Sequence, residues 1–314
     1  MAFHLRVVTA GEVTERVVAL LAGEPGVSNL VVMHAAARRP EGDAVQCDVR
    51  SSAASSVLTR LKGACEPDAG PVAIEVVDAV VGERPQRATG LGIVQRDAAP
   101  VWDVVHARIR SGAVYAPSFY TLLAIAGLIG AVGILINSQI LIVGAMVVGP
   151  EYSAIMGVAL GMDRRDRQLV ITGLLGLTAG FLAAIILTLV LGLVIRGAGE
   201  TPRAFSEGVR PIAALISSPD VFSVVVAVLA GIVGVVSLTE SRAGALIGVF
   251  ISVTTIPAAA NIGLSIAYGD WAKAEGSIYQ LLLNVVVLIV VGALVMRLQR
   301  RFWRSRSGTP APAR

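Results

Sequence analysis

The pattern of apolar and polar positions changes near residue 118. Before this point, apolar side chains recur at the short periods of strands and amphipathic helices, and after it they form long, almost unbroken runs. A period of two indicates a half-buried strand and a period of 3.6 an amphipathic helix, whereas about 20 consecutive apolar residues are enough to cross a bilayer. The chain is therefore predicted to have a water-soluble front part and a membrane part.

The front part, residues 1–82, alternates between the two short periods. Its expected elements are a strand at 3–9, a helix that ends before Gly23, strands at 27–35 and 44–49, a helix at 53–65 and a strand at 72–80. This order, β-α-β-β-α-β, is the ferredoxin-like arrangement of an α+β domain. The two helices cover one face of the sheet, and the other face is expected to meet either a neighbour or water.

Residues 83–117 are predicted to connect the two parts. They begin as a polar stretch that contains glycine and proline. A short amphipathic helix follows Pro100, with Val101, Val105 and Ile109 on one face. Such a helix is expected to lie either in the plane of the membrane interface or against the front domain.

Six spans are predicted within residues 118–296, which makes this part an all-α membrane domain. The spans are 118–136, 140–160, 169–195, 221–238, 243–267 and 278–296. The composition agrees, because 55% of the residues are apolar and 15% are charged, which is too apolar for an ordinary soluble protein.

Positive charge is concentrated in two places of the membrane part. The loop 163–167 carries three arginines, and residues 297–314 form a basic tail. Positively charged loops mark the cytosolic side of a membrane, so both chain ends are predicted to be cytosolic and the loop 197–220 to lie outside. A basic surplus in short loops and a tail fits a bilayer surface rather than nucleic acid.

Side chains that build catalytic or metal sites are few and scattered. The cysteines, Cys47 and Cys65, are too few for a disulfide framework, and His4, His34 and His106 have no metal-ligand spacing with them. No set of nucleophile, base and acid shares a plausible location, and no glycine-rich phosphate loop follows a strand. No enzyme activity, cofactor or metal is therefore predicted.

Two segments of the membrane part are similar to each other. Each begins at a serine, Ser138 or Ser241, continues with an apolar pair followed by glycine, and meets a proline inside an apolar run, Pro150 or Pro257. With three spans in each half, the second half would enter the membrane upside down relative to the first. Paired, proline-interrupted spans are typical of the inverted repeats of transporters, whose sites lie between them.

Glu151 is the one ionisable side chain well inside a predicted span, and it follows Gly149 and Pro150 directly. A charge at this depth costs about 3 kcal/mol on insertion scales, so it normally faces a cavity or a partner. The proline breaks the helix and leaves backbone groups unpaired. These three residues are therefore predicted either to bind a cation or a proton in a transport site or to cap the half-helix that follows.

The second segment carries polar side chains on both sides of Pro257. They are Ser252, Thr254, Thr255 and Asn261. We expect them, with Pro257, either to complete the site around Glu151 or to satisfy the broken backbone and nothing else. Asn284 in the last span is expected to form a hydrogen bond to a neighbouring helix.

Three stretches of the membrane part have a distinctive sequence: Leu141-Ile-Val-Gly-Ala-Met-Val-Val-Gly-Pro150, Gly157-Val-Ala-Leu-Gly161 and Pro257-Ala-Ala-Ala-Asn-Ile-Gly263. They resemble the prokaryotic family called domain of unknown function 389, the "uncharacterised hydrophobic domain" proteins. The resemblance covers nearly all of 118–296, and the front part is similar to that of actinobacterial members. Members often have a second Gly-Pro soon after the first, where this chain has Glu151-Tyr-Ser-Ala. The resemblance implies a multi-pass protein of the bacterial inner membrane and names no activity.

The leading hypothesis is a secondary transporter or channel-like permease for a small solute or ion, with its site between the second and fifth spans. The alternative is a membrane-anchored sensor or assembly protein, whose ferredoxin-like domain binds a metabolite or pairs with copies of itself. A homo-oligomer is expected in either case.

Overall fold

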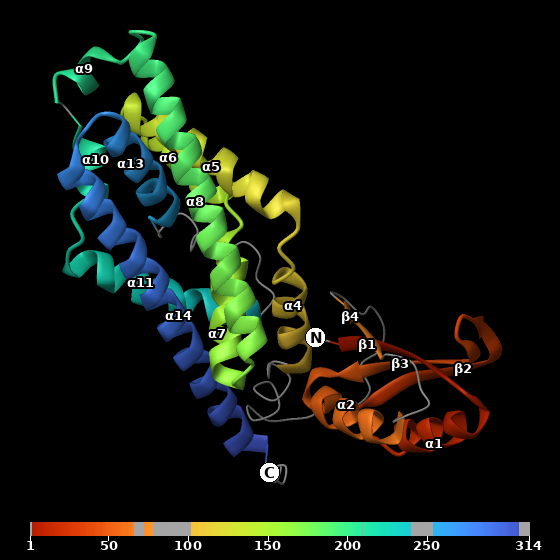
Figure 1. Ribbon diagram of the computed structural model, residues 1–314. Coiled ribbons are helices and arrows are strands. Elements are labelled where there is room, and N and C mark those ends of the chain that lie inside the picture. Colours follow the sequence, from red (N-terminus) through yellow and green to blue (C-terminus); the bar gives the residue numbers. More distant parts are fainter. Residues whose placement is uncertain (1, 66–71, 78–101, 209, 240–253, 308–314) are drawn as a thin grey trace. The chain divides into compact units, whose positions relative to one another are not determined.

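The structure is a computed structural model that describes residues 2–65, 72–77, 102–208, 210–239 and 254–307. The chain divides into two compact units, residues 1–105 and 106–314 (Figure 1). The division falls within the segment 83–117 that was predicted to connect the two parts.

The front unit is a four-stranded antiparallel sheet with two helices. Its elements are β1 (Ala2–Thr9), α1 (Gly11–Ala22), β2 (Val27–Arg38), β3 (Glu41–Arg50), α2 (Ser51–Cys65) and β4 (Ala73–Val77). The strand order is β2-β3-β1-β4, and every neighbouring pair is antiparallel. The predicted order β-α-β-β-α-β is confirmed, while residues 78–80 of the last predicted strand lie outside the described part of the chain.

Alternation along β1 decides which face of the sheet is covered. Phe3, Leu5 and Val7 are buried in one apolar core with residues of both helices, such as Val17 and Leu58. Because side chains alternate between the two faces of a strand, the residues between them point away from the helices.

Polar side chains occupy this second face of the sheet. His4 lies opposite Asp48 and Glu75 on the two neighbouring strands. Its Nδ1 atom is 2.8 Å from Oδ1 of Asp48, and Arg6 is exposed. Charged residues at these positions fit contact with water rather than an apolar neighbour.

The second unit is helical. Its helices are α4 (Trp102–Gly112), which begins in the front unit, α5 (Pro117–Leu135), α6 (Gln139–Val148), α7 (Glu151–Arg164), α8 (Arg167–Gly197), α9 (Arg203–Ser206), α10 (Pro211–Ile216), α11 (Val221–Thr239), α13 (Thr255–Ala267) and α14 (Trp271–Ser307).

Four helices among the described residues are long and apolar enough to cross a membrane: α5, α8, α11 and α14. A fifth span is formed if α6 and α7, which meet at an angle of 50°, are taken together. The predicted span 243–267 is described only from residue 254 onward, where it forms the shorter apolar helix α13. Several apolar helices are thus confirmed, whereas six spans and an inverted repeat stay predictions.

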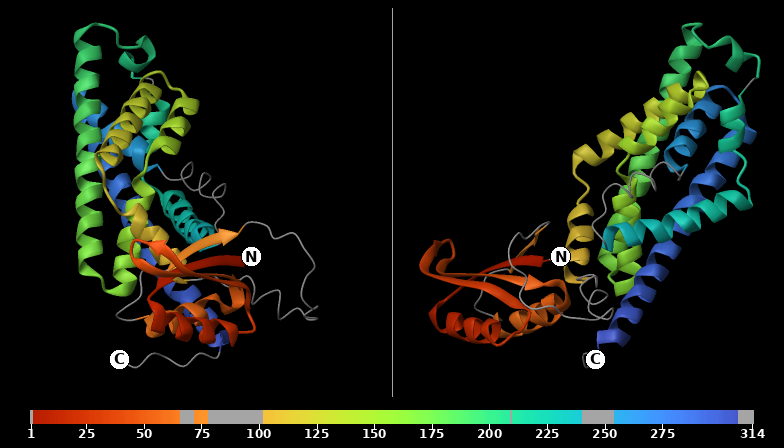
Figure 2. Two further views of the ribbon diagram at one scale, coloured as in Figure 1. Left: turned by 90° about the vertical axis from the view of Figure 1, so that its right-hand side faces the viewer. Right: turned by 180° about the vertical axis from the view of Figure 1, so that it is seen from behind.

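The long helix α8 is the surface on which the two shorter helices α7 and α13 pack (Figures 1 and 2). A Cβ atom added to Gly173 of α8 would meet Val158 of α7. A Cβ atom on Gly263 of α13 would lie 2.5 Å from the carbonyl oxygen of Ile185 and 2.7 Å from the amide nitrogen of Leu189, both in α8. Glycine therefore lets the backbones approach closely, with α7 on the first half of α8 and α13 on the second.

Charged groups fix one end of this helical unit. Asp163, near the end of α7, is almost fully buried, and its carboxylate lies 2.8 Å from Arg300 and 3.2 Å from Arg297 of α14. Two arginines on one buried carboxylate compensate its lost hydration. The first part of the predicted basic tail is thus helical, because α14 continues to Ser307, and Arg297 and Arg300 hold α7 in place.

The C-terminal end of α8 contacts the C-terminal end of α13. Arg196 donates a hydrogen bond to the carbonyl oxygen of Ala267, 2.8 Å away. Arg210 lies over the ring of Phe205 at 4.0 Å and is 3.4 Å from the carboxylate of Asp270. A cation at the C-terminus of a helix is favourable for its macrodipole. Two of the arginines in or beside the loop 197–220 are therefore engaged by the fold.

The end of α4 contacts the corner between α7 and α8. Arg110 forms an ion pair of 2.8 Å with Asp166, which is also the N-cap of α8. The following Ala113 reaches Gly157 of α7. This part of the predicted amphipathic helix is therefore packed on helices of the second unit, and Ile109 on its apolar face is buried.

We predict opposite outcomes for two glycines of the helical unit. Gly263→Ala should lower the stability by about 1–3 kcal/mol, because the new methyl group meets the α8 backbone and the helices must separate. Gly144→Ala should not lower the stability, since no atom outside the local helix backbone lies within 4 Å of the added Cβ and alanine favours a helix over glycine. Thermal unfolding of the purified protein in detergent measures both, and equal midpoints would contradict the packing of α13 on α8.

We also predict that Cys47 reports the folding of the front domain. Burial, and secondarily the charge of Asp48, raises the pKa of the Cys47 thiol to about 11. At pH 8 its thiolate should be about a hundred times scarcer in the folded domain than in the unfolded chain. In a Cys65→Ser variant, alkylation should therefore be slow in buffer and fast in denaturant, and fast native labelling would refute the burial of this thiol.

Candidate functional site

The span formed by α6 and α7 is broken at Gly149 and Pro150. Ser138 caps α6, and its side chain accepts a hydrogen bond from the amide of Leu141. The chain then becomes extended at Gly149, and α7 starts directly after Pro150. The carbonyl oxygen of Pro150 accepts hydrogen bonds from both the amide and the hydroxyl of Ser153, at 3.2 and 2.8 Å. The predicted break is confirmed, and a single Gly-Pro is enough to cause it.

Glu151 is the first residue of α7 and is buried. Its Oε1 atom accepts a hydrogen bond of 2.9 Å from the Thr255 hydroxyl, while no described residue donates one to Oε2. The side chain lies so close to Gly149 that a Cβ atom there would meet both Oε2 of Glu151 and the side chain of Ile256. Gly149 is therefore required for the carboxylate to occupy this position.

Helix α13 begins at Thr255, two residues before Pro257. The first amides of a helix have no carbonyl partner within it, so the missing N–H of Pro257 removes no hydrogen bond at this position. Among the described residues, Pro257 therefore lies in the first turn of a helix and does not interrupt one. The predicted site residue Ser252 lies outside the described part of the chain.

The N-termini of α7 and α13 meet at the hydrogen bond between Glu151 and Thr255. From this point the two helices run in opposite directions along α8, because α7 ends beside the start of α8 and α13 ends at Arg196 near its C-terminus. Each helix N-terminus carries about half a positive charge and favours an anion. The carboxylate of Glu151 is thus placed where two helix dipoles stabilise a negative charge.

Thr254, the N-cap of α13, joins this helix to α14. Its Oγ1 atom accepts hydrogen bonds from Nε2 of Gln280 at 3.2 Å and from Nδ2 of Asn284 at 3.0 Å. The expected interhelical bond of Asn284 is confirmed. Sequence reasoning missed Gln280, although Ser277, Gln280 and Asn284 form a buried polar stripe at helical spacing on an otherwise apolar helix.

Asn261 does not face Glu151. Its Nδ2 atom donates hydrogen bonds to the hydroxyl of Ser277 at 2.8 Å and to the carbonyl oxygen of Ala213 at 3.4 Å. The side chain therefore links α13 to α14 and α10. Of the predicted residues, the structure joins Glu151 to Thr255 and places Gly149 against Glu151 and Ile256, while Thr254 and Asn261 bind other partners.

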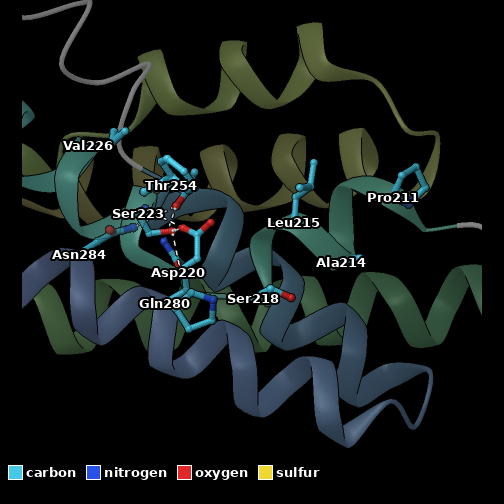
Figure 3. Close-up of a pocket in the computed structure, with 12 residues that line it drawn as sticks. Pro211, Ala214, Leu215, Ser218, Asp220, Ser223, Val226, Thr254, Gln280 and Asn284 are labelled. Carbon is cyan, nitrogen blue, oxygen red and sulfur yellow. Dashed lines mark hydrogen bonds between the residues drawn. The ribbon is translucent and has the colours of Figure 1, made fainter.

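The place where the starts of α7 and α13 meet, at Glu151 and Thr255, is called the junction below. A pocket of about 790 Å³ lies next to it (Figure 3). Its walls come from α10, the start of α11, α14 and the segment between α10 and α11. Thr254, Gln280 and Asn284 also line it, so a helix start and the polar stripe both face the pocket. The volume is within the usual range for small-molecule sites. Glu151 does not line the pocket, but its partner Thr255 adjoins Thr254 in the chain.

Comparison with known proteins gives one finding about family. The family model described as "Domain of unknown function (DUF389)" matches residues 146–290. This range contains α7, α13 and every described residue that lines the pocket. No curated protein and no solved structure matches the chain.

We predict that Thr254→Val destabilises the helical unit by about 2 kcal/mol. Valine has nearly the same shape but accepts no hydrogen bond, so the buried amides of Gln280 and Asn284 lose their acceptor. Thr254→Ser keeps the hydroxyl and should retain most of the stability. The comparison is made by thermal unfolding in detergent, and a valine variant as stable as the serine variant would refute the role of Thr254.

Proposed function

This chain is a member of the DUF389 family through residues 146–290, and we propose that it is a membrane permease that moves a small solute or ion past Glu151. The proposal is supported first by the several apolar helices, which are typical of an integral membrane protein. It is supported further by the broken helices and the pocket beside them.

The observation that carries the proposal is the meeting of two half-helices at a buried carboxylate. Irregular backbone at membrane depth is tolerated where it is buried in protein or lines a cavity. Half-helix ends of this kind form the ion and substrate sites of many transporters. The contact between Glu151 and Thr255 brings two such ends together from distant parts of the sequence.

Glu151 supplies the ionisable group of the site. As a carboxylate it accepts the hydrogen bond of Thr255 and is stabilised by both helix N-termini. Its Oε2 atom is buried and receives no hydrogen bond from a described residue, so it is available to a proton or a cation. Binding of either neutralises the charge between the helices and removes the interaction that favours their present arrangement.

The opposite directions of α7 and α13 support the inverted repeat, in which each half contributes one helix that starts at the contact between Glu151 and Thr255. The charges support an orientation with the α7–α8 corner and the end of α14 in the cytosol. In this orientation Arg196 and Arg210 lie on the outer side, where the fold engages both. We place the protein in a bacterial inner membrane, with both chain ends cytosolic.

A homo-oligomer is part of the same proposal. Large apolar side chains such as Leu175, Ile186 and Val194 are exposed along α8 in the isolated chain. A bilayer or another copy of the chain would cover them.

The proposal predicts ion movement that depends on Glu151. Vesicles that contain the purified protein and a trapped pH dye are given a potassium diffusion potential with valinomycin, and proton entry is recorded. The wild type should admit protons faster than empty vesicles. Glu151→Gln should reduce this rate at least about tenfold, since the amide neither carries a proton nor attracts a cation.

Asn261→Ala is the matched control in the same helix junction, because this residue faces α14 and α10 rather than Glu151. Entry of sodium and of benzylammonium, a small organic cation, is measured in parallel with the same vesicles. Wild-type vesicles that are as tight as empty ones to all three cations, or a Glu151→Gln variant as active as the wild type, would refute the proposal.

A further inference from the structure

The pocket beside the junction has two chemically different regions. Its outer walls include apolar residues of α10 and α11, such as Leu215, Phe222 and Val226. Its polar residues are Gln280 and Asn284 of α14, Thr254 at the start of α13, and Ser218, Asp220 and Ser223 of α11 and the segment before it (Figure 3). A site of this form suits a molecule with an apolar body and a polar head, because each part meets a matching surface.

The polar region offers oxygen acceptors. Thr254 already accepts two hydrogen bonds, from the amide nitrogens of Gln280 and Asn284. Gln280 is 97% buried, given its exposed fraction of 3%, and no described residue donates a hydrogen bond to its Oε1 atom. A buried acceptor without a partner costs free energy, so a ligand that brings a donor to this oxygen gains an interaction that the empty protein lacks.

The charge of the pocket is negative among its described lining residues. Asp220 is the one charged side chain, and no lysine or arginine is present in that set. The amide of Ser223 donates a hydrogen bond of 2.8 Å to the Asp220 carboxylate. This bond, followed by that of the Ser223 hydroxyl, holds the pKa of Asp220 below its ordinary value, so the group is charged at neutral pH.

We propose that this pocket binds a small organic cation, with an apolar body against α10 and α11 and an ammonium head at Gln280 and Asn284. The proposal rests on the permease function and names the class of its solute. An ammonium group brings several N–H donors to the oxygen of Gln280, and its charge is attracted by Asp220. A carboxylate head would leave that oxygen without a donor and be repelled by Asp220.

Size separates this ligand from a bare metal ion. The pocket of about 790 Å³ is far larger than an ion needs, and its apolar walls offer no ligands to one. The described residues also contain no group of three histidine, cysteine, aspartate or glutamate side chains that could hold a metal. The apolar volume is instead filled by the body of an organic molecule, which gains free energy as it leaves water.

Three probes with one body and different heads test the assignment: benzylammonium, benzyl alcohol and benzoate. Binding to the full-length protein in lipid nanodiscs is measured by calorimetry, with empty nanodiscs to subtract partition into lipid. Benzylammonium should bind at least about tenfold more tightly than benzoate, with benzyl alcohol between them. Equal affinities for the three, or tighter binding of benzoate, would overturn the proposal.

Variants at Gln280 locate the head group. Gln280→Leu should raise the Kd of benzylammonium about tenfold, and Gln280→Glu should lower it, because a carboxylate strengthens the attraction to a cation. Gln299→Leu is the matched control. Gln299 is also a glutamine of α14 whose buried side-chain oxygen receives no hydrogen bond from the described residues, and it is not among the described residues that line the pocket. Opposite effects of the two Gln280 variants cannot come from misfolding alone, and unchanged affinity in both would overturn the assignment.

Failure of this proposal is distinct from failure of the permease function. Benzylammonium binding that depends on Gln280 would support the pocket assignment. If the vesicles at the same time pass no cation, the permease function is refuted. Proton entry that depends on Glu151, without binding of benzylammonium, supports the permease and overturns the pocket assignment.

Discussion

The free backbone amides at the starts of α7 and α13 are the constraint around which the helical unit is arranged. The first turn of any helix has N–H groups without intrahelical acceptors, and in an apolar surrounding each unsatisfied group costs several kcal/mol. Here two such starts meet, and the carboxylate of Glu151 lies at both. The Thr255 hydroxyl is the one described group that donates a hydrogen bond to this acid, so a side-chain contact joins the two helix starts. A carboxylate beside two helix N-termini also interacts favourably with both helix dipoles.

Helix α8 determines where the two starts can meet. Close contacts at Gly173 and Gly263 bring α7 and α13 against different halves of α8. Ion pairs of Asp163 with α14 hold the far end of α7, and the hydrogen bond of Arg196 holds the far end of α13. Because both half-helices are fixed at their C-termini and along their length, their N-termini have little freedom. The contact of Glu151 with Thr255 follows from packing elsewhere.

The side chains of the consecutive residues Thr254 and Thr255 face two different groups of polar residues. The hydroxyl of Thr255 faces the buried acid, and that of Thr254 faces the polar stripe of α14 at the pocket. They are consecutive residues at the first turn of one helix, so a shift of α13 would move both together. This gives the proposed solute site a direct mechanical link to the proposed ionisable group, through one peptide unit and no intervening side chain.

The sequence by itself determined the elements: the β-α-β-β-α-β order, the apolar helices, the break at Pro150 and the buried acid at Glu151. Each depends on local periodicity, or on a residue that stops a helix or is costly in lipid, and these are properties of a short stretch of chain. Only the tertiary structure decided the partners. Asn261 is turned to Ser277 and not to Glu151, and Gln280 meets Thr254 across 26 positions. A polar residue on an apolar helix has to find a partner, but which neighbouring helix covers it depends on long-range packing, and periodicity along the chain does not encode that packing.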